Sequence, residues 1–196
     1  MLTRLKDRGL DLLNDGPDDA PERHRTLRKA IHRSYALFNP EEQQLFRTLG
    51  IFVGGFDLDA VVGLGYMEQT LQVLVNRSMV RVESRPDGTR RCLLLETLRE
   101  YAREQLVAHQ ELPAIQQRHA HYFITCAERH HQVNTSQAHL AWLNSLDRNL
   151  DNLQAAFVWA LEQRAVEPTL RLMVALQPFW FERELQPWAR RLYQAG

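Results

Sequence analysis

Apolar residues in the first part of the chain recur at steps of three and four, which is the spacing of one helix face. The apolar positions of the first such face are Leu27, Ala30, Ile31, Tyr35 and Phe38. Pro40 ends this helix and begins a second one, because Asn39 can act as its N-cap and proline fits the first helical turn. Glycines and a capping Asp57 then favour a short helix and a longer one. The pattern predicts helices over residues 26–38, 40–50, 57–63 and 67–77.

The period of the pattern then changes from helix to strand. Residues 79–83 alternate between polar and apolar side chains, with Val80 and Val82 expected on one face. The next segment, RPDGTR at residues 85–90, has the composition of a tight turn, and residues 91–95 are the expected returning strand. Three helices, with a short one between the second and the third, followed by a two-stranded hairpin are the layout of a winged helix.

Helical spacing returns after the hairpin and continues to the end of the chain. The pattern predicts helices over residues 96–107, 112–132, 137–146, 147–164, 166–182 and 186–195. Helices joined by short loops suggest antiparallel pairs of tetratricopeptide-like (TPR-like) type, although no clean period of about 34 residues is present. The predicted fold class is mainly α, a three-helix unit with a two-stranded wing followed by a TPR-like helical repeat. The expected parts are an N-terminal helix and linker (1–25), the winged helix (26–110) and the repeat segment (111–196).

Charge and composition exclude several functions for the chain as a whole. Its 24 Lys and Arg side chains balance its 24 Asp and Glu side chains, so no net field attracts nucleic acid or an anionic membrane. The two cysteines, Cys92 and Cys126, do not form a disulfide framework and fit a reducing compartment. Neither a signal peptide nor an apolar run of about 18 residues is present. We therefore expect a cytoplasmic protein with no membrane partner.

Four segments, in order, resemble a known family. They read TLRKAIHRSYALFNPEEQQLFRTLGIFVGGFDLDAV, LVNRSMVRV, LLLETLREYARE and LDRNLDNLQAAFVWALEQ. Together they are similar to the region after the nucleotide-binding module in bacterial STAND-class regulatory ATPases, which are NB-ARC relatives found with LuxR-type and SARP-type transcriptional regulators. The resemblance implies a winged helix that closes on a nucleotide-bound module elsewhere in the parent protein, and helical repeats that sense a signal or bind partners.

The catalytic half of such an ATPase is not contained in this sequence. No G-x-x-x-x-G-K-[ST] motif occurs, so this chain is not expected to be an enzyme or to hold a cofactor, and ATP or ADP would bind the parent protein. The family's Met-His-Asp motif aligns with Leu94, Leu95 and Glu96. Leu95 and Glu96 are thus the nucleotide-sensing position that the resemblance implies, but leucine replaces the phosphate-contacting histidine. Glu96 also fits a second interpretation, as a carboxylate stabilised at a helix N-terminus.

A winged helix that binds DNA needs cations on its third helix and on its wing. The exposed positions of helix 67–77 offer one cation and one anion, whereas specific DNA binders neutralise about 6 to 10 phosphates. The wing is better supplied, since Arg85, Arg90 and Arg91 surround its turn. These three arginines are a candidate surface for DNA or for docking another domain, and the charge pattern argues against DNA.

Two further groups of residues suggest more specialised chemistry. Cys126 and His130 have the i, i+4 spacing of metal ligands, and His119 lies on the same side of their helix. His119 is about 10 Å away along the helix, so the three cannot share one ion, and a buried histidine with a buried thiol is the favoured interpretation. No metal is expected.

Aromatic residues are dense in the last third of the chain. Trp142 and Trp159 have the helical spacing of packing residues. Phe179, Trp180 and Phe181 point in three directions on any helix, so one of these rings is expected at the surface as a possible partner-binding side chain.

These observations predict a non-catalytic regulatory and interaction segment of a STAND-type signalling ATPase or transcriptional regulator. The expected partners are the nucleotide-binding module, which this sequence does not contain, and an unidentified protein or small-molecule inducer. Helix 96–103 and the exposed side of the wing are the candidate docking surface. The alternative is a DNA-binding winged-helix regulator, and a metal-dependent enzyme is a third hypothesis.

Overall fold

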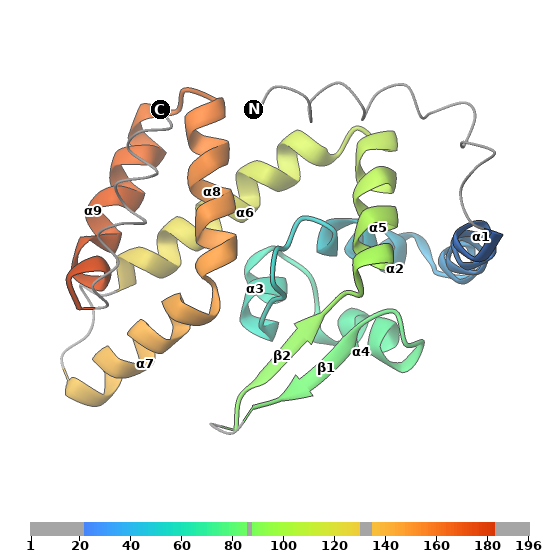
Figure 1. Cartoon of the computed structure of the whole chain (residues 1–196), viewed down its shortest axis with the longest axis horizontal. Coiled ribbons are helices and arrows are strands. Elements are labelled where there is room, and N and C mark those ends of the chain that lie inside the picture. Colours follow the sequence, from blue (N-terminus) through green and yellow to red (C-terminus); the bar gives the residue numbers. More distant parts are fainter. Residues whose placement is uncertain (1–21, 86–87, 130–134, 183–196) are drawn as a thin grey trace. The chain divides into compact units, whose positions relative to one another are not determined.

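The computed structural model describes residues 22–85, 88–129 and 135–182 (Figure 1). Two compact units are separated at Asn39, Met1–Asn39 and Pro40–Gly196, and helix α1 (Glu22–Ala36) belongs to the first. Several predicted features lie outside the described residues. They are the helix at the start of the chain, most of the linker, Pro86 and Asp87 of the turn, His130, and the helix over 186–195. The predicted domain limits at residues 25 and 110 stay predictions.

The second unit begins with a winged helix made of the helices and the wing that the sequence predicted from residue 40 onward. Its elements are α2 (Pro40–Leu49), α3 (Leu58–Gly63), α4 (Glu68–Asn76), β1 (Arg81–Ser84), β2 (Arg90–Leu93) and α5 (Glu96–Ala108). The strands pair antiparallel from Arg81 opposite Leu93 to Ser84 opposite Arg90. The mainly helical fold class with a winged helix, a two-stranded wing and further helices after it is therefore confirmed.

Helix α2 forms the centre of this domain. Leu45 and Phe46 on its inner face have no exposed surface, and Ala102 of α5 packs against the end of the helix with none either. The close approach depends on Gly50, since a Cβ atom there would lie 2.7 Å from the backbone nitrogen of Arg103. Any larger residue would separate α2 from α5.

One detail of the predicted wing is wrong. Val80 and Val82 were expected on one face, but Val80 is buried and Val82 is 39% exposed. Val80 precedes the strand and its amide still donates to the carbonyl of Leu74 at the end of α4. The strand therefore begins only at Arg81, after the chain has left the helix.

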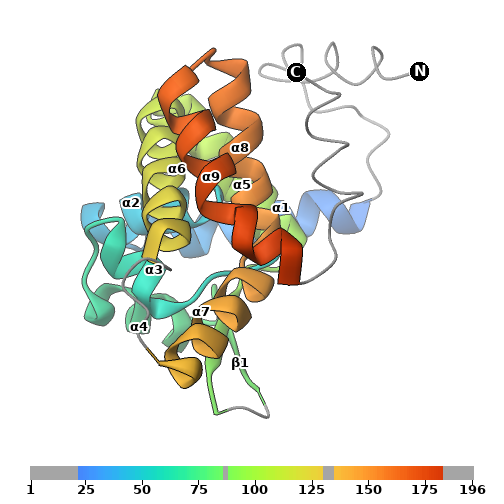
Figure 2. The same ribbon diagram turned by 90° about the vertical axis from the view of Figure 1, so that its left-hand side faces the viewer.

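The helical part comprises α6 (Leu112–Glu128), α7 (Ser136–Arg148), α8 (Leu150–Glu162) and α9 (Val166–Glu182). Thr135 caps α7, since its hydroxyl accepts a hydrogen bond from the amide of Ala138 at 3.1 Å. Helix α6 packs mainly on α8 and α9 and much less on α7. Figure 2 shows α6, α8 and α9 side by side. The helices predicted between residues 112 and 182 are present. The consecutive helices α8 and α9 pack together, but α6 packs mainly on helices that do not follow it directly, so a regular series of tetratricopeptide-like pairs is not supported. Among the described helices, none has the length and apolar character needed to cross a membrane.

Candidate functional site

A tight turn at Gly54 and Gly55 lies where the winged helix meets the helical part. Both glycines have positive φ angles, 68° and 91°. The next residue, Phe56, exchanges two backbone hydrogen bonds with Cys92 of β2, at 2.9 and 2.8 Å. A Cβ atom at Gly55 would lie 2.7 Å from the carbonyl oxygen of Cys92, so only glycine fits here. The turn is thereby held against the wing with its carbonyl groups available for other partners.

Arg91 of β2 fills the space beneath this turn. Its side chain is 3% exposed. Its Nη2 atom donates to the carbonyl oxygens of Gly54 and Gly55, at 3.1 and 2.9 Å. Its Nη1 atom donates to Asn149 Oδ1 at 2.8 Å and to Asp57 Oδ1 at 3.3 Å. One guanidinium therefore links the wing, the turn, the start of α3 and the start of α8.

Two asparagines of the helical part complete the contact. Asn152 of α8 donates from Nδ2 to the carbonyl of Gly55 at 2.9 Å, and its Oδ1 accepts from the amide of Val53 at 2.8 Å. Asn149 lies between α7 and α8, and its Nδ2 also donates to the carbonyl of Ser145. Asn152 has no exposed surface. We call the set of Gly54, Gly55, Asp57, Arg91, Asn149 and Asn152 the polar junction.

Charge in the polar junction is balanced locally. Burial lowers the pKa of Arg91, and the facing carboxylate of Asp57 opposes this effect. Arg148 of α7 is a second cation near that carboxylate, with Nε 3.9 Å from Asp57 Oδ2. Asp57 is 24% exposed, so it connects the buried guanidinium to the surface. Removing Asp57's charge would leave Arg91 buried without an anion.

An ion pair and an aromatic layer extend the same interface. Arg47 of α2 donates from Nε and Nη2 to the two carboxylate oxygens of Glu111 before α6, at 2.8 and 2.7 Å. Phe52 stacks on Phe56 at 4.7 Å between ring centres and meets His119 of α6 edge-on at 5.4 Å. These contacts give the winged helix and the helical part a continuous core.

His119 is the buried histidine that the sequence favoured. It is 3% exposed, its Nε2 lies 3.3 Å from Asn152 Oδ1, and burial lowers its pKa to about 4. Cys126 is half-buried, and no cluster of three or more metal-ligating side chains occurs among the described residues.

Helix α4 and the wing present a second feature, an uncovered face. Figures 1 and 2 both place α6, α8 and α9 away from α4 and the wing. The exposed positions of this face are Glu68, Gln69, Gln72, Asn76, Arg77, Arg81, Ser84 and Arg90. Gln72 donates to Asn76 at 2.8 Å, and Arg81 lies 3.3 Å from Glu83. The polar side chains exposed here include amides along α4 and cations towards the wing, and Val82 of β1 is exposed as well.

The three predicted wing arginines occupy different environments. Arg90 is exposed and Arg85 is half-buried, so both remain candidates for contact with a partner. The prediction for Arg91 as a surface residue is wrong, because its side chain points into the polar junction. Charge alone did not indicate which of the two arginines of β2 faces the interior and which faces solvent.

Leu95 and Glu96 lie at the start of α5. Leu95 is 58% exposed. Glu96 occupies the first helical turn and accepts from Arg99 Nη2 at 2.6 Å, a hydrogen bond that lowers the pKa of Glu96. This geometry agrees with the helix-terminus interpretation. The nucleotide-sensing role stays a prediction.

The three consecutive aromatic residues near the end of α9 differ in exposure, because they point to different sides of the helix. Phe179 has no exposed surface, Trp180 is half-buried and Phe181 is 64% exposed. Phe179 is therefore part of the core, and Phe181 is the ring at the surface, as expected of one of the three. A role of these residues in partner binding stays a prediction.

Sequence reasoning missed Asp57, Asn149 and Asn152 as functional residues. A signal was present, since Asn152 follows the apolar spacing of Leu153, Ala156 and Phe157 while carrying an amide. A polar side chain on an apolar helix face needs a buried partner. The identity of that partner, a turn almost 100 residues earlier, could not be derived from spacing.

Helices α2, α3 and α4 and the two-stranded wing form a winged helix-turn-helix domain, and further helices follow it. Residues 38–107 match the winged helix-turn-helix domain family. Similar curated proteins include "Putative HTH-type transcriptional regulator Rv0890c" of Mycobacterium tuberculosis and "Putative HTH-type transcriptional regulator Mb0914c" of Mycobacterium bovis, each 39% identical over 190 residues. The match covers 89% of this chain and 21% of each relative, so the chain spans about a fifth of their length.

"Uncharacterized protein Rv0894" of Mycobacterium tuberculosis is 30% identical over 124 residues, covering 59% of this chain and 31% of that protein. No solved structure matches the chain. The comparisons support homology to helix-turn-helix transcriptional regulators. They favour the DNA-binding alternative more directly than the STAND ATPase, and they give no support to TPR repeats.

Proposed function

We propose that this chain is a non-catalytic regulatory segment of a transcriptional regulator, in which the winged helix and the helical part move as one body. The polar junction carries this proposal. Arg91 and Asn152 each make hydrogen bonds across the interface, and both are buried. A displacement of the helical part alone would have to break several of these bonds at once, so the wing moves with it instead.

The proposal includes a partner within the parent protein. The resemblance to STAND-class ATPases implies a nucleotide-binding module, and we assign ATP or ADP to that module. Exposed Glu96 at the start of α5 and exposed Arg90 beside the turn of the wing would contact the module in one state of the switch and not in the other. Differential contact of this kind is what couples two sites.

The substitution Asp57→Asn, introduced into the gene that encodes this chain, tests the proposed coupling between the helical part and the wing. The substitution removes the anion that faces Arg91, so the polar junction weakens. We expect the expression of the regulated genes to differ from that in the wild-type strain, as measured by RNA sequencing beside a deletion strain. Asp59→Asn is the matched control, because it makes the same charge change on an exposed residue of α3. Equal transcript profiles for both variants and the wild type would contradict the proposal, provided that hydrogen exchange confirms a looser junction in Asp57→Asn.

DNA binding is the second candidate function. It is favoured by the names of the similar proteins and by the uncovered face of α4 and the wing. Glutamine and asparagine side chains like those on α4 can read adenine in the major groove. The cations towards the wing, Arg77, Arg81, Arg85 and Arg90, are fewer than the six to ten phosphate contacts that specific binders typically make.

A salt titration separates this candidate from the first. If the wing binds DNA, a fluorescent duplex of random sequence should bind at low salt, with a slope of log K against log salt near −3 for about three to four phosphate contacts. Arg85→Ala/Arg90→Ala should lower the magnitude of that slope by about two. The matched control, Arg129→Gln/Arg164→Asn, removes two exposed charges from the helical part and should keep the slope. No anisotropy change at low salt would remove DNA binding and leave the first proposal intact.

A further inference from the structure

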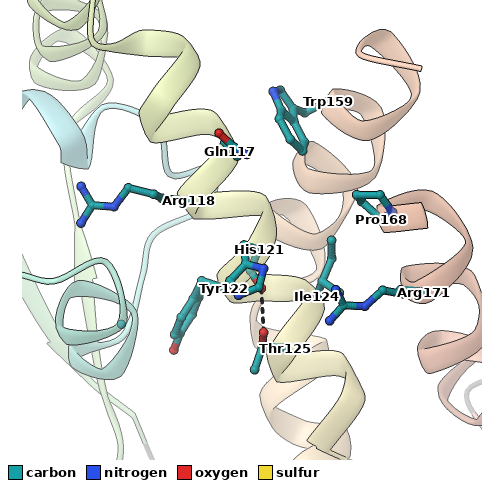
Figure 3. A pocket seen from close by; sticks show the side chains of 10 residues that line it. Gln117, Arg118, His121, Tyr122, Ile124, Thr125, Trp159, Pro168 and Arg171 are labelled. Carbon is teal, nitrogen blue, oxygen red and sulfur yellow. Dashed lines mark hydrogen bonds between the residues drawn. The ribbon is translucent and has the colours of Figure 1, made fainter. Parts of the chain in front are cut away.

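An open groove of about 490 Å³ follows the outward face of α6. Figure 3 shows Trp159 and Pro168, from α8 and α9, on one side of this face, and Arg118 and Tyr122 on the other. Gly63 of α3 contributes to the lining, so the groove borders both the winged helix and the helical part. Its volume is within the range of sites for small organic ligands, about 300 to 1,000 Å³.

The charge of the groove is one-sided. Its ten lining residues include two arginines and one histidine but no carboxylate, although the chain as a whole has equal numbers of acids and bases. Arg171 is neutralised by a bidentate pair with Glu128, at 2.7 and 2.8 Å. Among the described residues, Arg118 has no carboxylate within ion-pair distance, and its guanidinium lies 5.7 Å from the ring centre of Tyr66. That contact orients the cation but leaves its N–H groups free for an anion.

The remaining walls are apolar and aromatic. Trp159 is half-buried, and Ile124 beneath it is buried. His121 is exposed on α6, and its carbonyl accepts the hydroxyl of Thr125 at 2.9 Å, which aligns Thr125 along the helix. An indole face and a guanidinium that no described carboxylate neutralises, in one groove, suit a ligand with a flat apolar ring and a negative charge.

We infer that this groove binds a small aromatic carboxylate. The ligand's ring packs against Trp159, and its charge is stabilised by Arg118. Because the groove borders Gly63 of α3 as well as α8 and α9, such a ligand contacts both parts that the polar junction links. Binding itself is independent of the proposed function, whereas a regulatory effect of the ligand rests on it.

Binding of biphenyl-4-carboxylate to the 196-residue chain tests the inference. A ligand of this size in an open groove should bind with a Kd on the order of 1 mM, and the neutral biphenyl-4-carboxamide about threefold to fivefold more weakly. Two-dimensional ¹⁵N–¹H NMR measures both affinities and locates the site. The expected shifts fall on Gln117, His121 and Thr125 of α6.

Two variants test which side chain contacts the ring of the ligand and which contacts its carboxylate. Arg118→Gln should weaken the carboxylate threefold to fivefold and leave the carboxamide unchanged, and Trp159→Leu should weaken both. Arg103→Gln removes an exposed cation of α5 outside the groove and should change neither affinity. The inference is overturned if acid and amide bind equally, if the shifts lie elsewhere, or if 5 mM acid, a concentration of about five times that Kd, causes no shifts. None of these results would alter the Asp57→Asn test of the proposed function.

Discussion

Arg91→Met is expected to lower the free energy of unfolding by about 3–5 kcal/mol, the cost of breaking a buried ion pair from one side. The methionine fills part of the space but makes no hydrogen bond. The carbonyl groups of Gly54 and Gly55 then lose their guanidinium donor, and Asn149 loses its partner at 2.8 Å. Urea unfolding followed by far-ultraviolet circular dichroism measures the change.

Two variants make this prediction specific. Arg90→Met changes the neighbouring exposed arginine of β2 and should stay within about 0.5 kcal/mol of the wild type. Arg91→Lys keeps the charge without the planar fork, so its stability should fall between those of the wild type and Arg91→Met. If Arg91→Met and Arg90→Met unfolded at the same urea concentration, the polar junction would contribute nothing to stability.

The elements of the fold were predictable because their signals are local. Three- and four-residue spacing marked the helices to within a few residues, and the RPDGTR turn marked the wing. The same spacing identified His119 as a core residue. Each of these inferences depends on neighbours within one or two turns of the chain, and that is the range over which periodicity carries information.

The polar junction was not predictable because its residues are distant in sequence. Asn152 bonds to Val53 and Gly55, and Arg91 bonds to Asn149, so the contacts need the tertiary arrangement. Periodicity also predicts a helix but not the helix it packs against, and this is why tetratricopeptide-like pairs were expected where α6 packs on α8 and α9. For the same reason a positive charge at Arg91 was interpreted as surface, since arginine is rarely buried unless it is paired.

His119 should make the stability of the chain depend on pH between about 6.5 and 4. The folded-state pKa is about 4 because the ring is buried, whereas the unfolded chain titrates near 6.5. Above this window histidine is neutral in both states and contributes nothing to the pH dependence. As the pH falls through this window, His119 binds a proton in the unfolded state but not in the folded state. Stability is therefore lost at about 1.4 kcal/mol per pH unit, about 3 kcal/mol in total.

His119→Gln tests this account, because glutamine can still donate to Asn152 Oδ1 but does not titrate. Urea midpoints measured from pH 7 to pH 4 should fall less steeply for this variant than for the wild type. His121→Gln, which changes an exposed histidine of the same helix, should reproduce the wild-type curve. If the urea midpoints of His119→Gln fell with pH as steeply as those of the wild type, His119 of the wild type would bind a proton in the folded state as well. The ring would then have to leave its place between Phe52 and Phe123, and the core that joins the two parts of the chain would open at mildly acidic pH.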